Sequence, residues 1–214
     1  MTTHGNADSS IYSLYAVTDR TWTSKKTLKE QLEEALKGGV TLVQLREKEL
    51  STEKFLEEAM EIKSLCDSYG VPLIINDNAE IALKTDAAGI HIGQEDMGVL
   101  KARELLGPDK IIGVSARTVA QAKKAEKEGA DYLGAGAVFG TNTKKDAKNM
   151  STELLREICA AVSIPVVAIG GVTEENISAL KDTGIAGVAV VSAIFAKEDI
   201  FQAAEELREK VERI

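Results

Sequence analysis

Eight short apolar runs recur along the chain, and they constrain the fold more than any other feature of the sequence. They are IYSLYAV (11–17), TLVQLR (41–46), PLIIN (72–76), AGIHIG (88–93), KIIGVS (110–115), DYLGAGAVF (131–139), PVVAIG (165–170) and GVAVV (187–191). Near-continuous hydrophobicity is typical of parallel strands that are covered on both faces. Amphipathic helical patterns lie between the runs, for example at 27–39, 51–70, 118–129, 173–184 and 199–214. The alternation predicts an α/β protein with a parallel sheet.

The spacing of the runs favours a closed barrel. Dividing 214 residues among eight units leaves about 27 residues for each, enough for one strand, one helix and two loops. The rival, an open doubly wound sheet, favours a G-x-G-x-x-G turn after the first strand, and AVTDRTWTS contains none. We therefore predict a single (β/α)8 TIM barrel over residues 11–214, preceded by a flexible, polar tail over residues 1–10.

The charge balance limits the partners of such a domain. The formal net charge of −8 repels nucleic acid and anionic membranes, so an anionic substrate needs a local cluster of cations. The longest apolar stretch, GVAVVSAIFA, is about half the roughly 20 residues that a membrane helix needs. Cys66 and Cys159 lie in apolar helical patterns and belong to no disulfide framework or zinc motif. We expect a cytoplasmic protein with neither nucleic-acid nor membrane partners.

Polar residues gather where the predicted strands end, which is where barrels carry their chemistry. Gln44, Arg46 and Lys48 alternate at the end of the second strand, so an extended segment places them on one face. Two cations and an amide on one face suit the oxygens of a phosphate or a diphosphate. A solvated strand end with ordinary surface charges explains the same pattern when it is taken alone.

Two carboxylates follow the third and fourth strands. Asp77 comes directly after PLIIN, and Asp96 comes shortly after AGIHIG. Beside a cationic row, two such carboxylates are suited to hold Mg²⁺ between the protein and a phosphorylated ligand. The alternative is that each residue caps the helix that follows it. Capping accounts for either residue separately, but not for their joint position next to Arg46 and Lys48.

Three further segments offer places for a phosphate. The loop GTNTKKDAKNM after the sixth strand contains Thr141, Thr143 and Lys144, which suit an anion, although a flexible solvated loop is the alternative. Gly171 and Ser192 follow the seventh and eighth strands, where barrels often bind phosphate through backbone amides, although an ordinary tight turn explains the Gly170–Gly171 pair taken alone. His91 is expected to line the barrel or its core. The chain contains no G-x-S-x-G or H-E-x-x-H motif, so hydrolase chemistry is disfavoured.

Seven motifs in register strongly resemble the thiamine phosphate synthase family. They are QLREK, NDNAEIAL, GIHIGQEDM, GVSARTV, GAVFGTNTKKDA, AIGGVTEEN and AVVSAIF, and the match runs from about residue 11 to the C-terminus. The resemblance implies a TIM barrel that uses two phosphorylated heterocyclic substrates. One is 4-amino-2-methyl-5-(diphosphooxymethyl)pyrimidine, and the other is 4-methyl-5-(2-phosphooxyethyl)thiazole in its usual or its carboxylated form.

The resemblance also implies a role for each matching residue. The pyrimidine diphosphate is expected to contact Gln44, Leu45, Arg46, Glu47, Lys48, Asn76, Ser115 and Lys144. The thiazole phosphate is expected to contact Thr141, Asn142, Thr143, Gly171, Val191 and Ser192. Asp77 and Asp96 are expected to bind Mg²⁺. Gly140 departs from the family pattern, which usually has proline there, so the order or closure of this loop is expected to differ.

The chemistry implied by the resemblance is a dissociative substitution at the pyrimidine CH₂. Diphosphate leaves, a stabilised pyrimidine methyl cation forms, and the thiazole nitrogen attacks it. Arg46, Lys48 and Lys144 are then the catalytic residues, because the developing negative charge needs cations rather than a general base. A thiazole tautomerase-like isomerase, a non-catalytic barrel that binds phosphorylated ligands and a sugar-phosphate isomerase are the alternatives. The sequence leaves open whether the chain forms a homo-oligomer.

Overall fold

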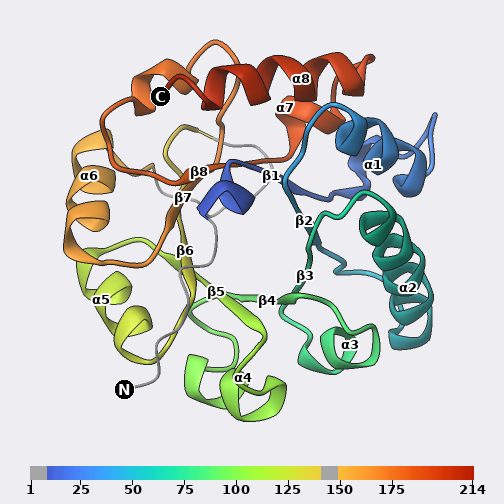
Figure 1. Cartoon of the computed structure of the whole chain (residues 1–214), viewed down its shortest axis with the longest axis horizontal. Coiled ribbons are helices and arrows are strands. Elements are labelled where there is room, and N and C mark those ends of the chain that lie inside the picture. The colour runs from blue at the N-terminus through green and yellow to red at the C-terminus, as the bar shows by residue number, and fades with distance from the viewer. Residues whose placement is uncertain (1–8, 141–148) are drawn as a thin grey trace.

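Eight parallel strands close into a barrel in chain order (Figure 1). The computed structural model describes residues 9–140 and 149–214. The strands are β1 (Leu14–Val17), β2 (Leu42–Leu45), β3 (Leu73–Asn76), β4 (Gly89–Ile92), β5 (Ile111–Ala116), β6 (Tyr132–Gly136), β7 (Val166–Ile169) and β8 (Gly187–Val190). Each strand pairs with the next, and β8 pairs with β1 to close the ring. The predicted (β/α)8 barrel is therefore confirmed, and each strand lies within one of the eight apolar runs.

Helices surround the barrel (Figure 1). They are α1 (Leu28–Lys37), α2 (Thr52–Ser68), α3 (Ala79–Lys84), α4 (Val99–Leu106), α5 (Val119–Lys127), α6 (Thr152–Ala161), α7 (Ser192–Phe195) and α8 (Ile200–Val211). Three short 3₁₀ segments complete the described elements: η1 (Ser9–Tyr12), η2 (Arg20–Trp22) and η3 (Ile177–Leu180). Residues 9 and 10, at the end of the expected tail, belong to η1. Among the described residues, no helix is long and apolar enough to span a membrane.

One expected helix is wrong in type and length. The pattern over 173–184 predicted a full helix, but only the single 3₁₀ segment η3 forms. The Asn176 side chain accepts a hydrogen bond from the Thr173 amide and donates one to the Gly171 carbonyl. These bonds offer the backbone an alternative to a regular helical start. At the other end, Lys181 adopts ψ of 142° and stops the segment.

Local signals in the sequence fix several helix starts. Thr27 and Glu30 form a capping box at α1, in which each side chain accepts from the other residue's backbone amide. Ser51 and Ser151 cap α2 and α6 by accepting from the amide three residues later. Such caps satisfy amides that have no partner within the helix, and each typically contributes about 1 kcal/mol. The helices are thereby held at defined ends around the barrel.

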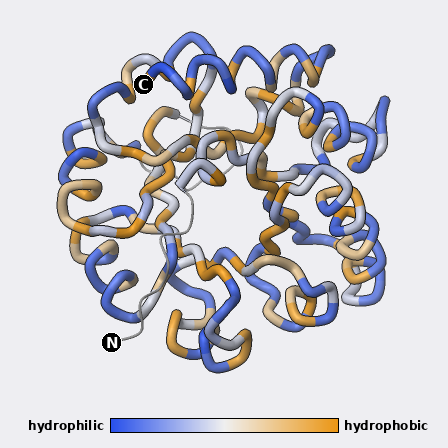
Figure 2. The backbone as a smooth tube through the Cα atoms, viewed as in Figure 1, coloured by the Kyte–Doolittle hydropathy of each residue, from blue (hydrophilic) through white to orange (hydrophobic). Residues whose placement is uncertain are grey.

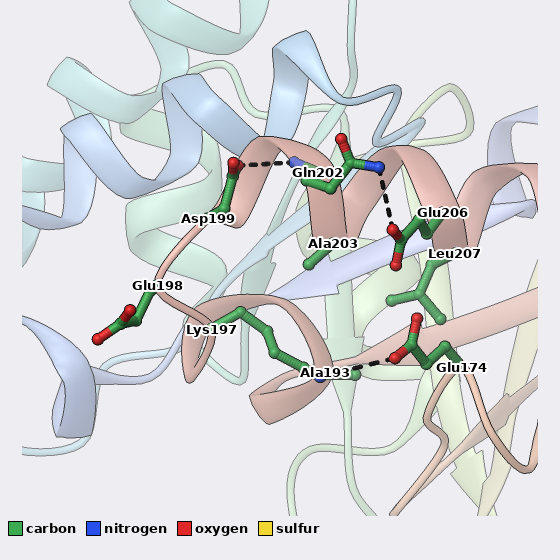
Figure 3. A pocket seen from close by; sticks show the side chains of 9 residues that line it. All are labelled: Glu174, Ala193, Lys197, Glu198, Asp199, Gln202, Ala203, Glu206 and Leu207. Carbon is green, nitrogen blue, oxygen red and sulfur yellow. Dashed lines mark hydrogen bonds and ion pairs between the residues drawn. The ribbon is translucent and has the colours of Figure 1, made fainter.

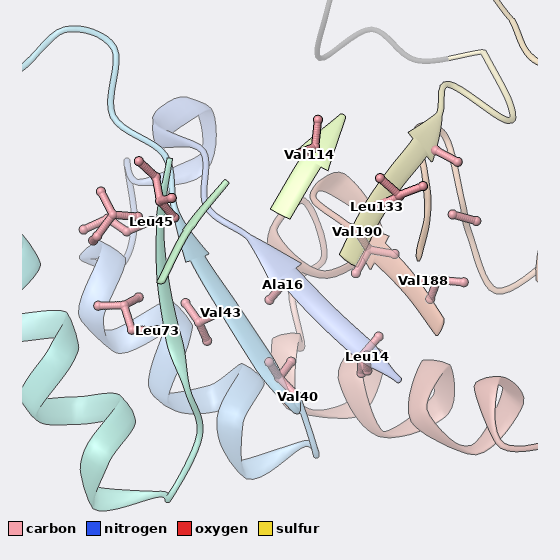
Figure 4. Close-up of a cluster of buried hydrophobic side chains, with 14 of the residues drawn as sticks. Leu14, Ala16, Val40, Val43, Leu45, Leu73, Val114, Leu133, Val188 and Val190 are labelled. Carbon is pink, nitrogen blue, oxygen red and sulfur yellow. The ribbon is translucent and has the colours of Figure 1, made fainter. Parts of the chain in front are cut away.

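Two apolar layers follow from the alternation of side chains along each strand. Leu14, Val43, Leu45 and Val188 are among the strand residues that face the helices and form the larger cluster (Figure 4). The intervening residues fill the barrel in a second cluster of Tyr12, Tyr15, Val17, Leu42, Ile74, Tyr132, Val167 and Ala189. Figure 2 shows hydrophobic colour along the strands and hydrophilic colour on the outer sides of the helices. Cys66 is buried, Cys159 is partly buried, and both are free thiols.

Candidate active site

The carboxyl ends of β2 and β3 bring three predicted site residues together. Lys48 Nζ lies 2.5 Å from Asp77 Oδ2, and Asn76 Nδ2 donates to the same oxygen at 2.6 Å. Asp77 adopts φ of +60°, a conformation that is uncommon for residues other than glycine. Asp86 and Asp182 adopt similar values of +50° and +59° outside this rim, so the conformation by itself does not mark the site. The turn places the Asp77 carboxylate against Lys48 at the rim of the barrel.

The helix-capping explanation for Asp77 and Asp96 is wrong. Asn78, and not Asp77, caps α3 by accepting from the Ile81 amide, while the residue at the start of α4 is Gly98. Asp96 instead folds back onto its own loop, where Oδ2 accepts from the Gly93 amide at 2.7 Å. Neither carboxylate is therefore used to start a helix. Since β3 and β4 are parallel neighbours, both carboxylates follow the carboxyl ends of adjacent strands.

The donor set at this rim fits a hard divalent cation. Mg²⁺ is commonly held by one or two carboxylates together with waters and substrate phosphates. Gly93 also fits this arrangement, because a Cβ at that position would lie 2.8 Å from Asp96 Oδ2 and displace the carboxylate. Within residues 9–140 and 149–214, no group of three or more His, Cys, Asp or Glu side chains is suited to hold a metal. The predicted ligands Asp77 and Asp96 therefore offer two carboxylates, fewer than a site built from protein side chains alone would need.

The predicted residues at the end of β2 have side chains on both sides of the strand. Gln44 lies inside the barrel, where its amide nitrogen donates to the Tyr15 hydroxyl at 2.8 Å. The Arg46 amide donates to the buried Thr18 hydroxyl at 2.9 Å, which fixes the backbone at this point. Leu45 packs against the helices (Figure 4). Its side chain therefore points away from the barrel interior, so Leu45 has only backbone atoms to offer a ligand there.

The Glu47 side chain is also turned outward. Arg20 Nε lies 2.7 Å from Glu47 Oε2, and Arg20 Nη2 lies 2.5 Å from Glu58 Oε1 on α2. The remaining oxygens, Glu47 Oε1 and Glu58 Oε2, are buried without a hydrogen-bond partner among the described residues. Burial and the neighbouring Glu47 carboxylate raise the pKa of Glu58 to about 7. This arrangement, which we call the Arg20 clamp, ties the backbone between Arg46 and Lys48 to α2.

The barrel interior contains a polar chain that the sequence reasoning missed. The Tyr15 and Tyr132 hydroxyl oxygens are 2.8 Å apart, and the Tyr132 hydroxyl lies 2.9 Å from His91 Nδ1. His91 Nε2 in turn lies 2.9 Å from the Ser115 hydroxyl. The expectation that His91 lines the barrel is confirmed. Period-two alternation puts Tyr15 on the same face as its apolar neighbour Val17, and that signal was available in the sequence.

Tight packing surrounds the Gly170–Gly171 turn after β7. Both residues have positive φ, +96° and +66°. A Cβ on Gly171 would overlap the Gly140 carbonyl oxygen, while the Phe139 amide donates to the Gly170 carbonyl at 2.9 Å. Glycine is therefore required here by both conformation and space. The turn meets the segment that leaves β6, as expected if the two loops share one ligand.

The start of α7 follows β8 directly. Val191 occupies the N-cap position and Ser192 is the first helical residue. Within the described chain, no side chain caps this short helix. Thr141, Asn142, Thr143 and Lys144 lie outside the described residues. Gly140, which replaces the usual proline, is exposed at the edge of the described segment.

A surface pocket of about 210 Å³ lies apart from the predicted site (Figure 3). It is lined by Glu174, Ala193, Lys197, Glu198, Asp199, Gln202, Ala203, Glu206 and Leu207, which come from α7, α8, the connection between these two helices and the loop after β7. None of the predicted ligand-binding residues lines it. Lys197 and Glu174 are at ion-pair distance, and the other charged residues of the lining are carboxylates, so the pocket is acidic.

Comparison with known proteins gives a consistent result. The sequence model described as thiamine monophosphate synthase matches residues 14–194. The thiamine-phosphate synthase of Clostridium tetani is 55% identical over 195 residues, covering 91% of this chain and 93% of that protein. That of Ruminiclostridium cellulolyticum is 53% identical over 198 residues, covering 92% and 94%. The solved structure of thiamine phosphate pyrophosphorylase from Pyrococcus furiosus superposes with a TM-score of 0.89 at 41% identity, covering 96% of this chain and 98% of that one.

Proposed function

The chain belongs to the thiamine monophosphate synthase family, and from this premise we propose how its residues serve the reaction. The enzyme joins 4-amino-2-methyl-5-(diphosphooxymethyl)pyrimidine to 4-methyl-5-(2-phosphooxyethyl)thiazole and releases thiamine phosphate and diphosphate. One observation supports the site assignment most strongly. The Lys48–Asp77 contact joins the cationic row to a carboxylate that does not cap a helix.

Departure of diphosphate is the step that this rim is suited to assist. Arg46 and Lys48 would neutralise the negative charge that develops on the leaving oxygens, and Lys144 would join them from the loop after β6. Bound Mg²⁺, held by Asp77 and Asp96, would supply further charge neutralisation to the diphosphate. Loss of one prepositioned cation is expected to lower kcat about 10²- to 10³-fold, by analogy with oxyanion-hole donors.

The second substrate would bind on the opposite part of the rim. Gly171 brings the turn after β7 against the segment that leaves β6, and the uncapped start of α7 at Val191 and Ser192 offers amide groups. Thr141, Asn142 and Thr143 would complete this phosphate site. Holding the thiazole nitrogen close to the pyrimidine CH₂ reduces the entropic cost of the coupling. The attack itself needs no general base, because the nitrogen lone pair carries no proton.

The proposal is tested by incubating the protein with both phosphorylated heterocycles and Mg²⁺ and measuring thiamine phosphate by mass. Lys48→Ala should reduce kcat strongly. Lys63→Ala is the matched control, since Lys63 also forms a 2.5 Å ion pair, with Asp67 on the surface of α2. Turnover of thiazole phosphate without the pyrimidine would favour the tautomerase-like alternative. Tight binding of both heterocycles without product would favour a non-catalytic binding barrel.

We also propose that the enzyme acts in the cytoplasm, on two phosphorylated small molecules. Both cysteines are free thiols, which is typical of reducing compartments. The formal net charge of −8 disfavours nucleic acid as a partner. Fractionation of cells that express the chain, followed by the coupling assay on each fraction, tests the localisation.

A further inference from the structure

Five polar residues form one continuous hydrogen-bonded chain across the inside of the barrel. It begins at Gln44 on β2, passes through the hydroxyls of Tyr15 on β1 and Tyr132 on β6, and continues to His91 on β4 and Ser115 on β5. Each of its four contacts is 2.8 or 2.9 Å long. Its two ends, Gln44 and Ser115, are residues that the proposed function assigns to the pyrimidine diphosphate. The residues between them have no assigned role in that function.

The barrel is built to hold this chain. Gly113 on β5 lies in register with Tyr132 on β6, and a Cβ at Gly113 would overlap the tyrosine ring. Gly134 likewise leaves space for the His91 ring, because a Cβ there would lie 3.1 Å from His91 Cε1. Two strand glycines weaken a sheet, so they indicate that another group must approach closely. Here the groups that approach are Tyr132 and His91, two of the three inner members of the chain.

The orientation of the Gln44 amide, together with one proton on each hydroxyl, sets the direction of the hydrogen bonds. The Gln44 amide nitrogen donates to Tyr15, so the Tyr15 proton is available for Tyr132. Tyr132 then donates its own proton to His91 Nδ1. Burial raises the pKa of both tyrosines, which keeps both hydroxyl protons in place. With the Gln44 nitrogen facing Tyr15, any other direction leaves a buried hydroxyl proton without an acceptor in the chain, which costs about 1–3 kcal/mol.

The same reasoning gives the direction of the hydrogen bond between His91 and Ser115. With Nδ1 accepting, a neutral His91 carries its proton on Nε2 and donates it to the Ser115 oxygen. The Ser115 proton is then directed away from His91. At the other end, the Gln44 amide nitrogen is engaged with Tyr15, so the amide oxygen remains as the acceptor. The chain therefore presents a donor at one end and an acceptor at the other.

We propose that Tyr15, Tyr132 and His91 are positioning residues that fix Ser115 as a hydrogen-bond donor and Gln44 as a hydrogen-bond acceptor toward the pyrimidine substrate. The identity of that substrate rests on the proposed function. The direction of the hydrogen bonds rests only on the contacts within the barrel. A ligand with an acceptor facing Ser115 and a donor facing Gln44 meets no reorganisation cost, whereas the reverse arrangement requires every proton in the chain to move.

The direction is tested in the free protein by NMR of ¹⁵N-labelled histidine. The chain has two histidines, and His4→Asn assigns the remaining signals to His91. The proposal predicts that His91 carries its proton on Nε2 and that Nδ1 is unprotonated. Tyr132→Phe removes the donor to Nδ1 and should shift the population toward the other tautomer. Tyr15→Phe should leave the tautomer unchanged, because Tyr132 still donates. A proton on Nδ1 in the wild-type protein would overturn the proposal.

Kinetics test the positioning role separately. Tyr132→Phe should lower kcat/KM for the pyrimidine substrate about five- to tenfold, the effect of about one hydrogen bond. In a Ser115→Ala background the same change should have no further effect, because Tyr132 acts through Ser115. A purely structural role predicts instead that the two losses multiply, and that result would contradict the proposal. If Tyr132→Phe does not fold, Tyr15→Phe with Gln44→Ala gives the same comparison at the other end.

Tyr12→Phe is the matched control for both measurements. The Tyr12 ring lies 4.9 Å from the Tyr132 ring, but its buried hydroxyl has no hydrogen-bond partner among the described residues. Tyr12→Phe should leave the His91 tautomer and kcat/KM unchanged. An effect of Tyr12→Phe as large as that of Tyr132→Phe would show that any change in the barrel interior suffices, and would overturn the proposal. Because the NMR measurement needs no substrate, it can succeed or fail independently of the proposed function.

Discussion

Replacing Glu58 with glutamine should remove a specific part of the pH dependence of stability. In the Arg20 clamp, Glu47 and Glu58 share one arginine, and each carboxylate retains a buried oxygen without a partner among the described residues. Two adjacent carboxylates are most stable when they share one proton. Glutamine carries an N–H group where protonated Glu58 would carry its O–H group. Glu58→Gln therefore imitates the protonated form at every pH.

The sign follows from the raised pKa. The folded protein holds a proton on Glu58 up to a pH of about 7, whereas the unfolded chain releases it near 4.5. The folded state thus binds more protons between these values, so the free energy of unfolding falls as the pH rises through this window. The shift sets an upper limit of about 3 kcal/mol. Solvent screening at the partly exposed Glu58 side chain lowers the expected effect to about 1–2 kcal/mol.

Urea unfolding at pH 5, 6, 7 and 8 measures the effect. We expect wild type and Glu58→Gln to have similar stability at pH 5, and the variant to be about 1–2 kcal/mol more stable at pH 8. Glu61→Gln is the control, because Glu61 lies on the same helix but is half exposed and paired with Lys29. It should shift the curve by less than about 0.5 kcal/mol at every pH. A constant difference between wild type and Glu58→Gln across all four pH values would refute the shared proton.

Three further changes test other parts of the structure. Gly113→Ala should lower the free energy of unfolding by about 3 kcal/mol or more, because the alanine Cβ would overlap the Tyr132 ring. A decrease below about 1 kcal/mol in urea unfolding would contradict this packing. Gly171→Ala should raise KM for the thiazole phosphate at least tenfold and leave KM for the pyrimidine unchanged. The alanine would have to adopt a positive φ, and its Cβ would push back the segment that ends at Gly140. Equal effects on both KM values in steady-state kinetics would contradict the assignment. Arg103→Ala should lower the free energy of unfolding by about 2–4 kcal/mol without changing kcat. The wild-type Arg103 guanidinium donates to four backbone carbonyls and one carboxylate beneath the barrel, and alanine loses all of these bonds. A free energy of unfolding within about 0.5 kcal/mol of wild type would contradict this role.

The sequence predicted the barrel well because its strands are buried on both faces. Such strands appear as uninterrupted apolar runs, and all eight are present in the structure. The rim followed from the same pattern, because polar residues such as Asp77 come directly after strand ends. The helix expected at 173–184 was wrong because Asn176 binds the backbone on both sides, a local competition that apolar spacing does not reveal.

The candidate site was less accessible to sequence reasoning. Helix capping explained Asp77 or Asp96 taken separately until the structure assigned the starts of α3 and α4 to Asn78 and Gly98. The outward turn of Glu47 depends on Arg20, which lies 27 residues earlier in the chain. A contact of this kind depends on closure of the barrel and leaves no local pattern. The assignments of ligands to individual residues stay predictions.

The dependence of coupling on Mg²⁺ tests the central claim most directly. Initial rates of thiamine phosphate formation should be measured over a range of Mg²⁺ concentrations for wild type, Asp77→Asn, Asp96→Asn and the surface control Asp67→Asn. If Asp77 and Asp96 hold the ion, each of their variants should need at least tenfold more Mg²⁺ for half-maximal rate, while Asp67→Asn should match wild type. Unchanged Mg²⁺ requirements in both rim variants would contradict the account.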